Sequence, residues 1–217
     1  MTIYRIPENV KTIIFDIDGT LYTNSAYVFE QVDAQVRHYA ELHNMTAQEA
    51  RDKINIYRRK WSKEHGGKKI SLGNTLTAFG VSIDESIRWR NSLLHPECYL
   101  HRDEKLMETL RVLSERCRMI CVTNNPVDAA RQTLAAIGVD GLLTDIIGLD
   151  SCKKSKPAKE MLDLAAFQTG AAYSDCLSIG DRYDIDVALP LELGMGGIVV
   201  DGVEDIYGLP ELIIYNA

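Results

Sequence analysis

The sequence of 217 residues has no apolar run approaching the ~20 residues that a membrane-spanning helix needs. Its first residues, MTIYRIPENVKTIIF, lack the basic leader, apolar block and small-residue cleavage site of a secretory signal. Cysteine is scarce and scattered, at positions 98, 117, 121, 152 and 176, and no CxxC pair occurs. These spacings argue against a zinc site or a disulfide scaffold. We therefore expect reduced core thiols in a cytoplasmic protein.

Basic residues are also fewer than acidic ones. Lysine and arginine number 24 against 31 aspartates and glutamates, which gives a net charge of −7 and a pI near 5.3. This balance argues against a protein that binds nucleic-acid polymers or membrane surfaces, although it is compatible with a local basic pocket. The apolar fraction of 46% suffices for one packed domain, or for one domain with a substantial insertion.

A helical stretch interrupts the sheet-forming pattern early in the chain. The apolar run at 10–15, with TIIF at its centre, predicts a short buried strand. No second strand follows within about thirty residues, as a simple βαβ unit would require. Residues 26–94 instead have the pattern of successive helices. This stretch is therefore predicted to be an insertion.

Helical spacing and capping patterns define the elements of this insertion. The first helix is expected to bury one apolar face, made of Val28, Val32, Val36 and Tyr39. Two later helices are predicted to start at capping boxes, one formed by Thr46 with Glu49 and the other by Ser82 with Glu85.

From residue 103 onward, helices and short apolar strands alternate. Strands are predicted at 118–123, 145–149, 176–180 and 197–200, and helices at 104–116, 127–137, 157–168, 186–193 and 204–213. Apolar strands separated by helices predict a parallel sheet that is covered on both faces. The fold class is therefore α/β, a Rossmann-like parallel sheet with a helical domain inserted after its first strand. We place the core at 1–22 and 98–217, and the inserted domain at 23–97.

Polar residues follow the predicted strands at their carboxyl ends, where open parallel sheets bind ligands. Asp16 and Asp18 end the first strand, TNN at 123–125 ends the second, and GDRYDID at 180–186 follows a third. Lys156 lies in SKP, past another strand. Carboxylates gathered at one edge are unfavourable unless a cation compensates them. Oxygen ligands without histidine or cysteine favour Mg²⁺ over zinc, and the lysine would hold an anionic substrate beside the metal.

In this order, these segments resemble the signature of the haloacid dehalogenase-like (HAD) hydrolase superfamily. The pattern is a DxDGT turn, a Ser or Thr at a second strand end, a distant Lys and a GDxxxxD acidic pair. It occurs here as DIDGT, VTNN, SKP and GDRYDID. The full set in order is specific, whereas each motif alone is weak. The inserted helices are similar to the family's C1-type cap, so the resemblance covers the core and its insertion.

The resemblance implies a phosphatase that works through an aspartyl-phosphate. Asp16 would be the nucleophile, and Asp18 would protonate the leaving alcohol and then deprotonate the attacking water. Thr123 would bind phosphoryl oxygens, and Lys156 would neutralise their charge. Lys156 is chosen over its neighbours at 153, 154 and 159 because it alone precedes a proline, as in the family pattern.

The resemblance also implies the remaining ligands of the site. Mg²⁺ would be bound by the carboxylates of Asp16, Asp181 and Asp186 and by the backbone carbonyl of Asp18. Asn124 and Asn125 would bind substrate. Asp184 fits no position of the pattern, and we interpret it as an acid at a helix start.

Substrate choice is expected to depend on the cap. Lys68 and Lys69, in the loop at 65–74, either bind a second anionic group or belong to a solvated turn. DGTLY resembles the pyrimidine 5′-nucleotidase-like branch, which often has Asn where Gly19 stands. A nucleoside monophosphate is therefore the first expected substrate, and phosphoglycolate or a sugar phosphate the second. We expect no nucleic-acid polymer or membrane partner, and a monomer or homodimer.

Three other functions are weighed against this one. Haloacid dehalogenases lack the second aspartate and the metal, so Asp18 argues against dehalogenation. A phosphomutase remains an alternative within the family. A binding or regulatory module on the same fold is the alternative outside enzymes, but it would be expected to have lost one of the motifs.

Overall fold

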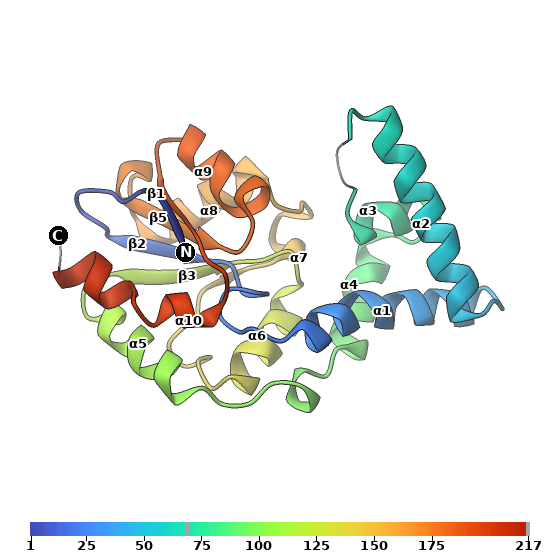
Figure 1. Ribbon diagram of the computed structural model, residues 1–217, viewed down its shortest axis with the longest axis horizontal. Helices are drawn as coiled ribbons and strands as arrows, with labels where there is room; N and C mark the ends of the chain where they lie inside the picture. The colour runs from blue at the N-terminus through green and yellow to red at the C-terminus, as the bar shows by residue number, and fades with distance from the viewer. Residues whose placement is uncertain (68–69, 216–217) are drawn as a thin grey trace. The chain divides into compact units, whose positions relative to one another are not determined.

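The computed structural model describes residues 1–67 and 70–215. The predicted substrate contacts of Lys68 and Lys69 lie outside these described residues. The chain divides into two compact units (Figure 1). One, the core, contains Met1–Ser25 and the chain from His95 onward. The other, the cap, is Ala26–Leu94.

The core contains one sheet of six strands. They are β1 (Thr2–Arg5), β2 (Thr12–Phe15), β3 (Arg118–Val122), β4 (Ile146–Ile147), β5 (Cys176–Gly180) and β6 (Gly196–Val199). Their order across the sheet is β1-β6-β5-β2-β3-β4, and every neighbouring pair is parallel except β1 with β6. The predicted α/β fold is confirmed, with one addition: β1 is an antiparallel edge strand that the sequence pattern did not predict.

The sheet is covered by helices on both faces, which explains the apolar character of its central strands. The helices of the core are α5 (Glu104–Ser114), α6 (Val127–Ala136), α7 (Leu149–Cys152), α8 (Lys159–Thr169), α9 (Ala188–Glu192) and α10 (Val203–Ile206). In Figure 1, α8 and α9 lie on one face and α5, α6 and α10 on the other. All four residues of β2 and all five of β5 are buried, as a strand covered on both faces requires.

Four short helical turns complete the core, and two of them change the predicted boundaries. They are η1 (Pro96–Cys98), η2 (Tyr173–Asp175), η3 (Tyr183–Val187) and η4 (Glu211–Tyr215). The single helix expected at 186–193 is instead the π-helical turn η3 followed by α9. The helix expected at 204–213 is likewise divided between α10 and η4.

The cap consists of helices α1 (Ser25–Leu42), α2 (Ala47–Glu64), α3 (Leu72–Ala78) and α4 (Ile83–Leu93). Both predicted capping boxes are confirmed: Thr46 with Glu49 starts α2, and Ser82 with Glu85 starts α4. The apolar cluster of the cap includes Ala50, Leu76 and Trp89, from three different helices.

The expected apolar face of α1 is wrong in the first half of the helix. Val28 and Val32 are more than 40% exposed, whereas Val36 and Tyr39 are buried. The reason is that another side of this part of the helix is buried, and it includes the polar residues Gln31, Asp33 and Gln35. In this region the buried position Asp33 is polar and forms ion pairs with arginines.

The cysteines are all free, and three of the five are buried. Cys98 is exposed, so the prediction of a core thiol is wrong for this residue. Among the described helices, none has the length and apolar character needed to cross a membrane.

Candidate active site

Three polar residues stand directly after three neighbouring strands. Asp16 follows β2, Thr123 follows β3 and Asp181 follows β5. Because β2 lies between β3 and β5, with Phe15 in register with Cys121 and Ile179, the three strands end at the same edge. The sheet thus brings together side chains that are far apart in the sequence.

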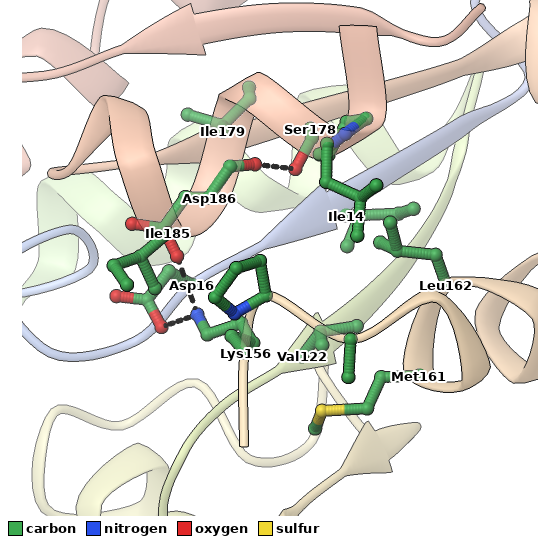
Figure 2. Close-up of a pocket in the computed structure, with 14 residues that line it drawn as sticks. Ile14, Asp16, Val122, Lys156, Met161, Leu162, Ser178, Ile179, Ile185 and Asp186 are labelled. Atoms are coloured by element: carbon green, nitrogen blue, oxygen red, sulfur yellow. Dashed lines mark hydrogen bonds and ion pairs between the residues drawn. The ribbon is translucent and has the colours of Figure 1, made fainter. Parts of the chain in front are cut away.

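Lys156 joins two of the acids at this edge (Figure 2). Its Nζ contacts Asp16 Oδ1 and lies 2.7 Å from Asp186 Oδ1. The side chains of all three residues are at most 10% exposed. The neighbouring Lys154 instead pairs with Glu160 at an exposed position. Of these two lysines, therefore, the one before the proline belongs to the buried acids.

A third carboxylate completes the cluster. One carboxylate oxygen from each of Asp16, Asp181 and Asp186 lies within 4.8 Å of the others. Asp184, by contrast, is exposed within η3 and is not part of the group. The cluster therefore has three carboxylates, of which Asp181 is half-buried, and one ammonium group, so negative charge is in excess.

Burial and mutual repulsion shift the pKa values of the cluster. Burial raises the pKa of Asp16 above its ordinary value, and the charge of Asp186 adds to this effect. Burial also raises the pKa of Asp181, again assisted by Asp186. Burial alone would lower the pKa of Lys156, but the charges of Asp16 and Asp186 outweigh it and raise that pKa. An added cation would favour the ionised carboxylates.

Two glycines make room for the acids. Gly19 has φ of +80°, and a Cβ there would lie 2.9 Å from Asp181 Oδ2. A Cβ on Gly180 would lie 2.4 Å from the Cβ and Cγ of Asp186. Any larger residue at either position would displace a carboxylate of the cluster.

The loop that carries Asp186 is fixed by two further bonds. Ser178 Oγ donates to the backbone carbonyl of Asp186 at 2.7 Å, and the backbone N–H of Arg182 donates to Asp186 Oδ2 at 3.1 Å. The loop between β5 and α9 therefore presents the carboxylate in a defined position.

The side chain of Asp18 is held by two donors. Tyr22 Oη donates to Oδ1 at 2.6 Å, and Asn125 Nδ2 donates to Oδ2 at 2.8 Å. Asn125, predicted to bind substrate, thus contacts Asp18 in this structure. Tyr22 was not predicted as a site residue, since nothing in the motif connects its hydroxyl to Asp18.

Asn124 connects two of the loops. Its Oδ1 accepts a hydrogen bond of 2.6 Å from the backbone N–H of Lys156. Thr123 is fully buried, and its Oγ1 accepts from the backbone N–H of Asn125 at 3.1 Å. The segment after β3 therefore positions both the lysine loop and Asp18.

A small, mostly apolar cavity of about 20 Å³ adjoins Lys156 (Figure 2). Its walls include Met161 and Leu162 of α8, together with Ile14 and Val122 of the sheet. These side chains keep one side of the charged cluster away from water.

The fold and the site therefore define an α/β protein with buried acids and a lysine beyond the central strands of its sheet. The chain belongs to the haloacid dehalogenase-like hydrolases, because the model of that family matches residues 10–192. The family match confirms the prediction that the protein is an enzyme of the hydrolase class.

In two curated relatives, about a quarter of the aligned residues are identical to those of this chain. The chain is 24% identical over 194 residues to pyrophosphatase PpaX of Listeria welshimeri. This alignment covers 87% of this chain and 83% of the relative. It is also 24% identical over 180 residues to pyrophosphatase PpaX of Bacillus pumilus, with coverage of 80% and 76%.

Solved structures with a similar fold cover nearly the whole chain. A HAD phosphatase from Thermococcus onnurineus aligns with a TM-score of 0.61 at 16% identity, covering 94% of this chain and 98% of that one. The putative HAD-hydrolase YfnB from Bacillus subtilis, solved bound to magnesium, aligns with a TM-score of 0.60 at 18% identity, covering 95% and 100%. At these identities the likeness establishes the fold.

Proposed function

We propose that the protein is a Mg²⁺-dependent phosphomonoesterase that acts through an aspartyl-phosphate on a small phosphorylated metabolite. The observation that carries the proposal is the buried cluster in which Lys156 contacts Asp16 and Asp186, with Asp181 alongside. The cluster combines a nucleophile, a fixed positive charge and uncompensated carboxylates. These are the groups that phosphoryl transfer needs.

The donor set fits Mg²⁺. It offers carboxylate oxygens from Asp16, Asp181 and Asp186, with the backbone carbonyl of Asp18 as the further ligand that the family resemblance implies. The glycines at 19 and 180 leave the space that two of these carboxylates occupy. When bound, Mg²⁺ would supply positive charge to the carboxylates and to the phosphoryl oxygens.

In the first step, a carboxylate oxygen of Asp16 attacks phosphorus and the bond to the leaving oxygen breaks. Asp18 donates a proton to that oxygen, so the product leaves as an alcohol. Lys156 holds negative charge on the transferred group, with Thr123 as a donor to its oxygens. Asn124 maintains the position of the lysine loop through its bond to the Lys156 N–H.

In the second step, water attacks the phosphorus of the aspartyl-phosphate and restores the carboxylate of Asp16. Asp18 accepts the proton of the water, which returns it to its starting protonation state. Tyr22 and Asn125 each bond one oxygen of Asp18 and so restrict its rotation. A positioned acid–base residue beside the nucleophile supports phosphate ester hydrolysis over dehalogenation, which needs no acid for a leaving alcohol.

The finer substrate class rests on sequence similarity. The DGTLY motif and helical cap favour a nucleoside monophosphate, with phosphoglycolate or a sugar phosphate next. The pyrophosphatase names of the curated relatives add inorganic pyrophosphate as a candidate. All of these ligands carry a terminal phosphoryl group that the site could transfer to water.

The test is phosphate release from a substrate panel, measured with Mg²⁺ and with EDTA. The panel includes nucleoside monophosphates, phosphoglycolate, sugar phosphates, pyrophosphate and an aryl phosphate. The matched control is Asp16→Asn, purified identically, which reveals any contaminating phosphatase. We expect Mg²⁺-dependent release by the wild-type protein only. Release that persists in EDTA, or no release from any compound by folded wild-type protein that binds Mg²⁺, would contradict the proposal.

A mutase would be recognised by its products. Transfer of phosphate between two hydroxyls of a sugar phosphate, without free phosphate, would support that alternative. Phosphorus NMR of the reaction mixture distinguishes the two outcomes.

A further inference from the structure

Some arginines of the cap form ion pairs with carboxylates, and others do not. Arg51, in the first half of α2, donates to both oxygens of Asp33, and Arg37 of α1 pairs with Asp33 and Glu30. In the second half of α2, Arg58 and Arg59 have no carboxylate within ion-pair distance among the described residues. Their positive charges are therefore uncompensated by the cap itself.

These two arginines line an open groove of about 410 Å³. Its other lining residues are Asn55, Ser62 and Ile70. Asn55, Arg58, Arg59 and Ser62 are spaced by three, four and seven residues from the first, so they lie on one face of α2. The groove is thus lined by two guanidinium groups, an amide and a hydroxyl, and none of its described lining residues is a carboxylate.

The groove is partly organised in advance. Nε and Nη2 of Arg58 donate to the backbone carbonyl of Ile70 at 3.1 and 2.9 Å. Arg59 Nε donates to the carbonyl of Asn55 at 3.3 Å. Each guanidinium retains further N–H donors beyond these bonds. Fixed guanidinium groups lose less freedom when they bind a ligand.

A simpler interpretation of these arginines is that basic residues near a helix C-terminus interact favourably with the helix dipole. That effect explains positive charge near Glu64, the last residue of α2, but it requires neither a groove, nor an anchored Arg58, nor a set of described lining residues without acids. The cap also has 11 lysines and arginines against 8 acids over 26–94, in a chain of net charge −7. A local basic groove in an acidic protein favours an anionic ligand.

We propose that this groove of the cap binds a phosphate-type oxyanion. The anion is either a free inorganic ion or an anionic group of a larger phosphorylated ligand, and both present the same oxygens to the arginines. The site is a property of the cap alone and does not rest on the hydrolytic function proposed above.

The test is a titration of the full-length protein with inorganic phosphate, followed by amide ¹H–¹⁵N NMR in EDTA at constant ionic strength. We expect saturable shifts of the amides of Asn55, Arg59 and Ser62, and none with chloride alone. Arg59→Gln should weaken this binding roughly tenfold or more, as expected for loss of a charge-assisted hydrogen bond. Arg88→Gln is the matched control: it removes one charge from an exposed residue of α4 and should leave the affinity unchanged.

The amides of Asp18 and Thr123 report phosphate at the hydrolytic site in the same spectra, so the two proposals succeed or fail separately. The same titration with a nucleoside monophosphate identifies the source of the anion. Tighter binding of this compound than of inorganic phosphate at the α2 amides assigns the groove to a group of a larger ligand, whereas equal or weaker binding assigns it to a free anion. The proposal is overturned if the α2 amides do not shift saturably, or if Arg88→Gln weakens binding as much as Arg59→Gln. Amide dispersion verifies that each variant is folded.

Discussion

The core and the cap each contain a cluster of charged side chains around a buried carboxylate, and the two clusters are balanced differently. In the core, one ammonium group, that of Lys156, faces the carboxylates of Asp16, Asp186 and Asp181. In the cap, the 6%-exposed Asp33 receives bonds from Arg51 at 2.7 and 2.9 Å and from Arg37 at 2.5 Å, and Arg37 also pairs with Glu30.

This difference separates a binding cluster from a structural one. The cap cluster has two cations and two anions, so it is satisfied without a ligand. The core cluster has more negative than positive charge and is largely buried. This excess of charge lowers the stability of the fold unless a cation is bound. The balance of charge, more than burial, therefore indicates which cluster binds a ligand. Substitutions in one cluster or the other test this difference.

The largest effect is expected from Asp16→Asn. The amide is a far weaker nucleophile, so phosphate release should fall by roughly 10⁴-fold or more. Lys156 retains Asp186 as a partner, so the fold should persist, which circular dichroism can verify. Near-normal turnover by the variant would show that Asp16 does not attack phosphorus.

Asp18→Asn should lower turnover by about 10²–10⁴-fold, the usual loss for an acid–base group. The loss should be smaller for an aryl phosphate, whose leaving group needs less protonation, than for an alkyl phosphate. Steady-state rates on both esters provide the measurement. Equal losses on the two esters would contradict the role of Asp18 as the acid in the first step.

Asp181→Asn should mainly raise the Mg²⁺ concentration needed for half-maximal activity, by roughly 10–100-fold, because a carboxylate ligand is lost. Turnover at saturating Mg²⁺ should change much less. Asp184→Asn, a neighbouring exposed carboxylate outside the cluster, is the matched control. If both variants shift the Mg²⁺ requirement equally, general surface charge rather than coordination is responsible.

Asp33→Asn should affect stability rather than metal dependence. We expect a loss of about 1–3 kcal/mol in the free energy of unfolding at neutral pH, limited by the partial exposure of the two arginines. Bonds from Arg51, and then from Arg37, lower the pKa of Asp33. Its contribution is therefore full above the unfolded-state pKa of about 4 and is lost as pH falls through the lowered folded-state value.

Urea unfolding of the wild type and the variant, from pH 7 down to about pH 3, should show the stability difference shrinking in acid. Asp52→Asn, at an exposed position of α2, should change stability by less than about 0.5 kcal/mol. A difference between wild type and Asp33→Asn that stays constant over this pH range would exclude the ionised carboxylate as its cause.

Short-range pattern was sufficient to predict where the acids stand. Asp16 and Asp181 each follow a short apolar run, and apolar runs between helices predict parallel strands whose ends meet. The capping boxes at Thr46 and Ser82 were equally local, and both are present. Spacing was a poorer guide for the apolar face of α1, where Val28 and Val32 are exposed.

Features set by long-range contacts could not be predicted in this way. The bond from Asn125 to Asp18 joins residues 107 positions apart, and the bond from Lys156 to Asn124 depends on how two loops meet. The strand β1 was missed because all four of its residues are exposed, so TIYR carries no burial pattern. Its place in the sheet comes from pairing with β6, near the other end of the chain.

The position of β2 at the centre of the sheet also bears on how the chain folds during synthesis. Thr12 pairs with Arg118, 106 residues later, and with Cys176. The apolar strand TIIF therefore emerges from the ribosome long before its partners, while the cap between them can fold from local contacts. Unpaired apolar strands of this kind are sites of aggregation, and flanking charges suppress it. Lys11, Asp16 and Asp18 flank TIIF, so the aspartates at the strand end would also keep a nascent strand soluble.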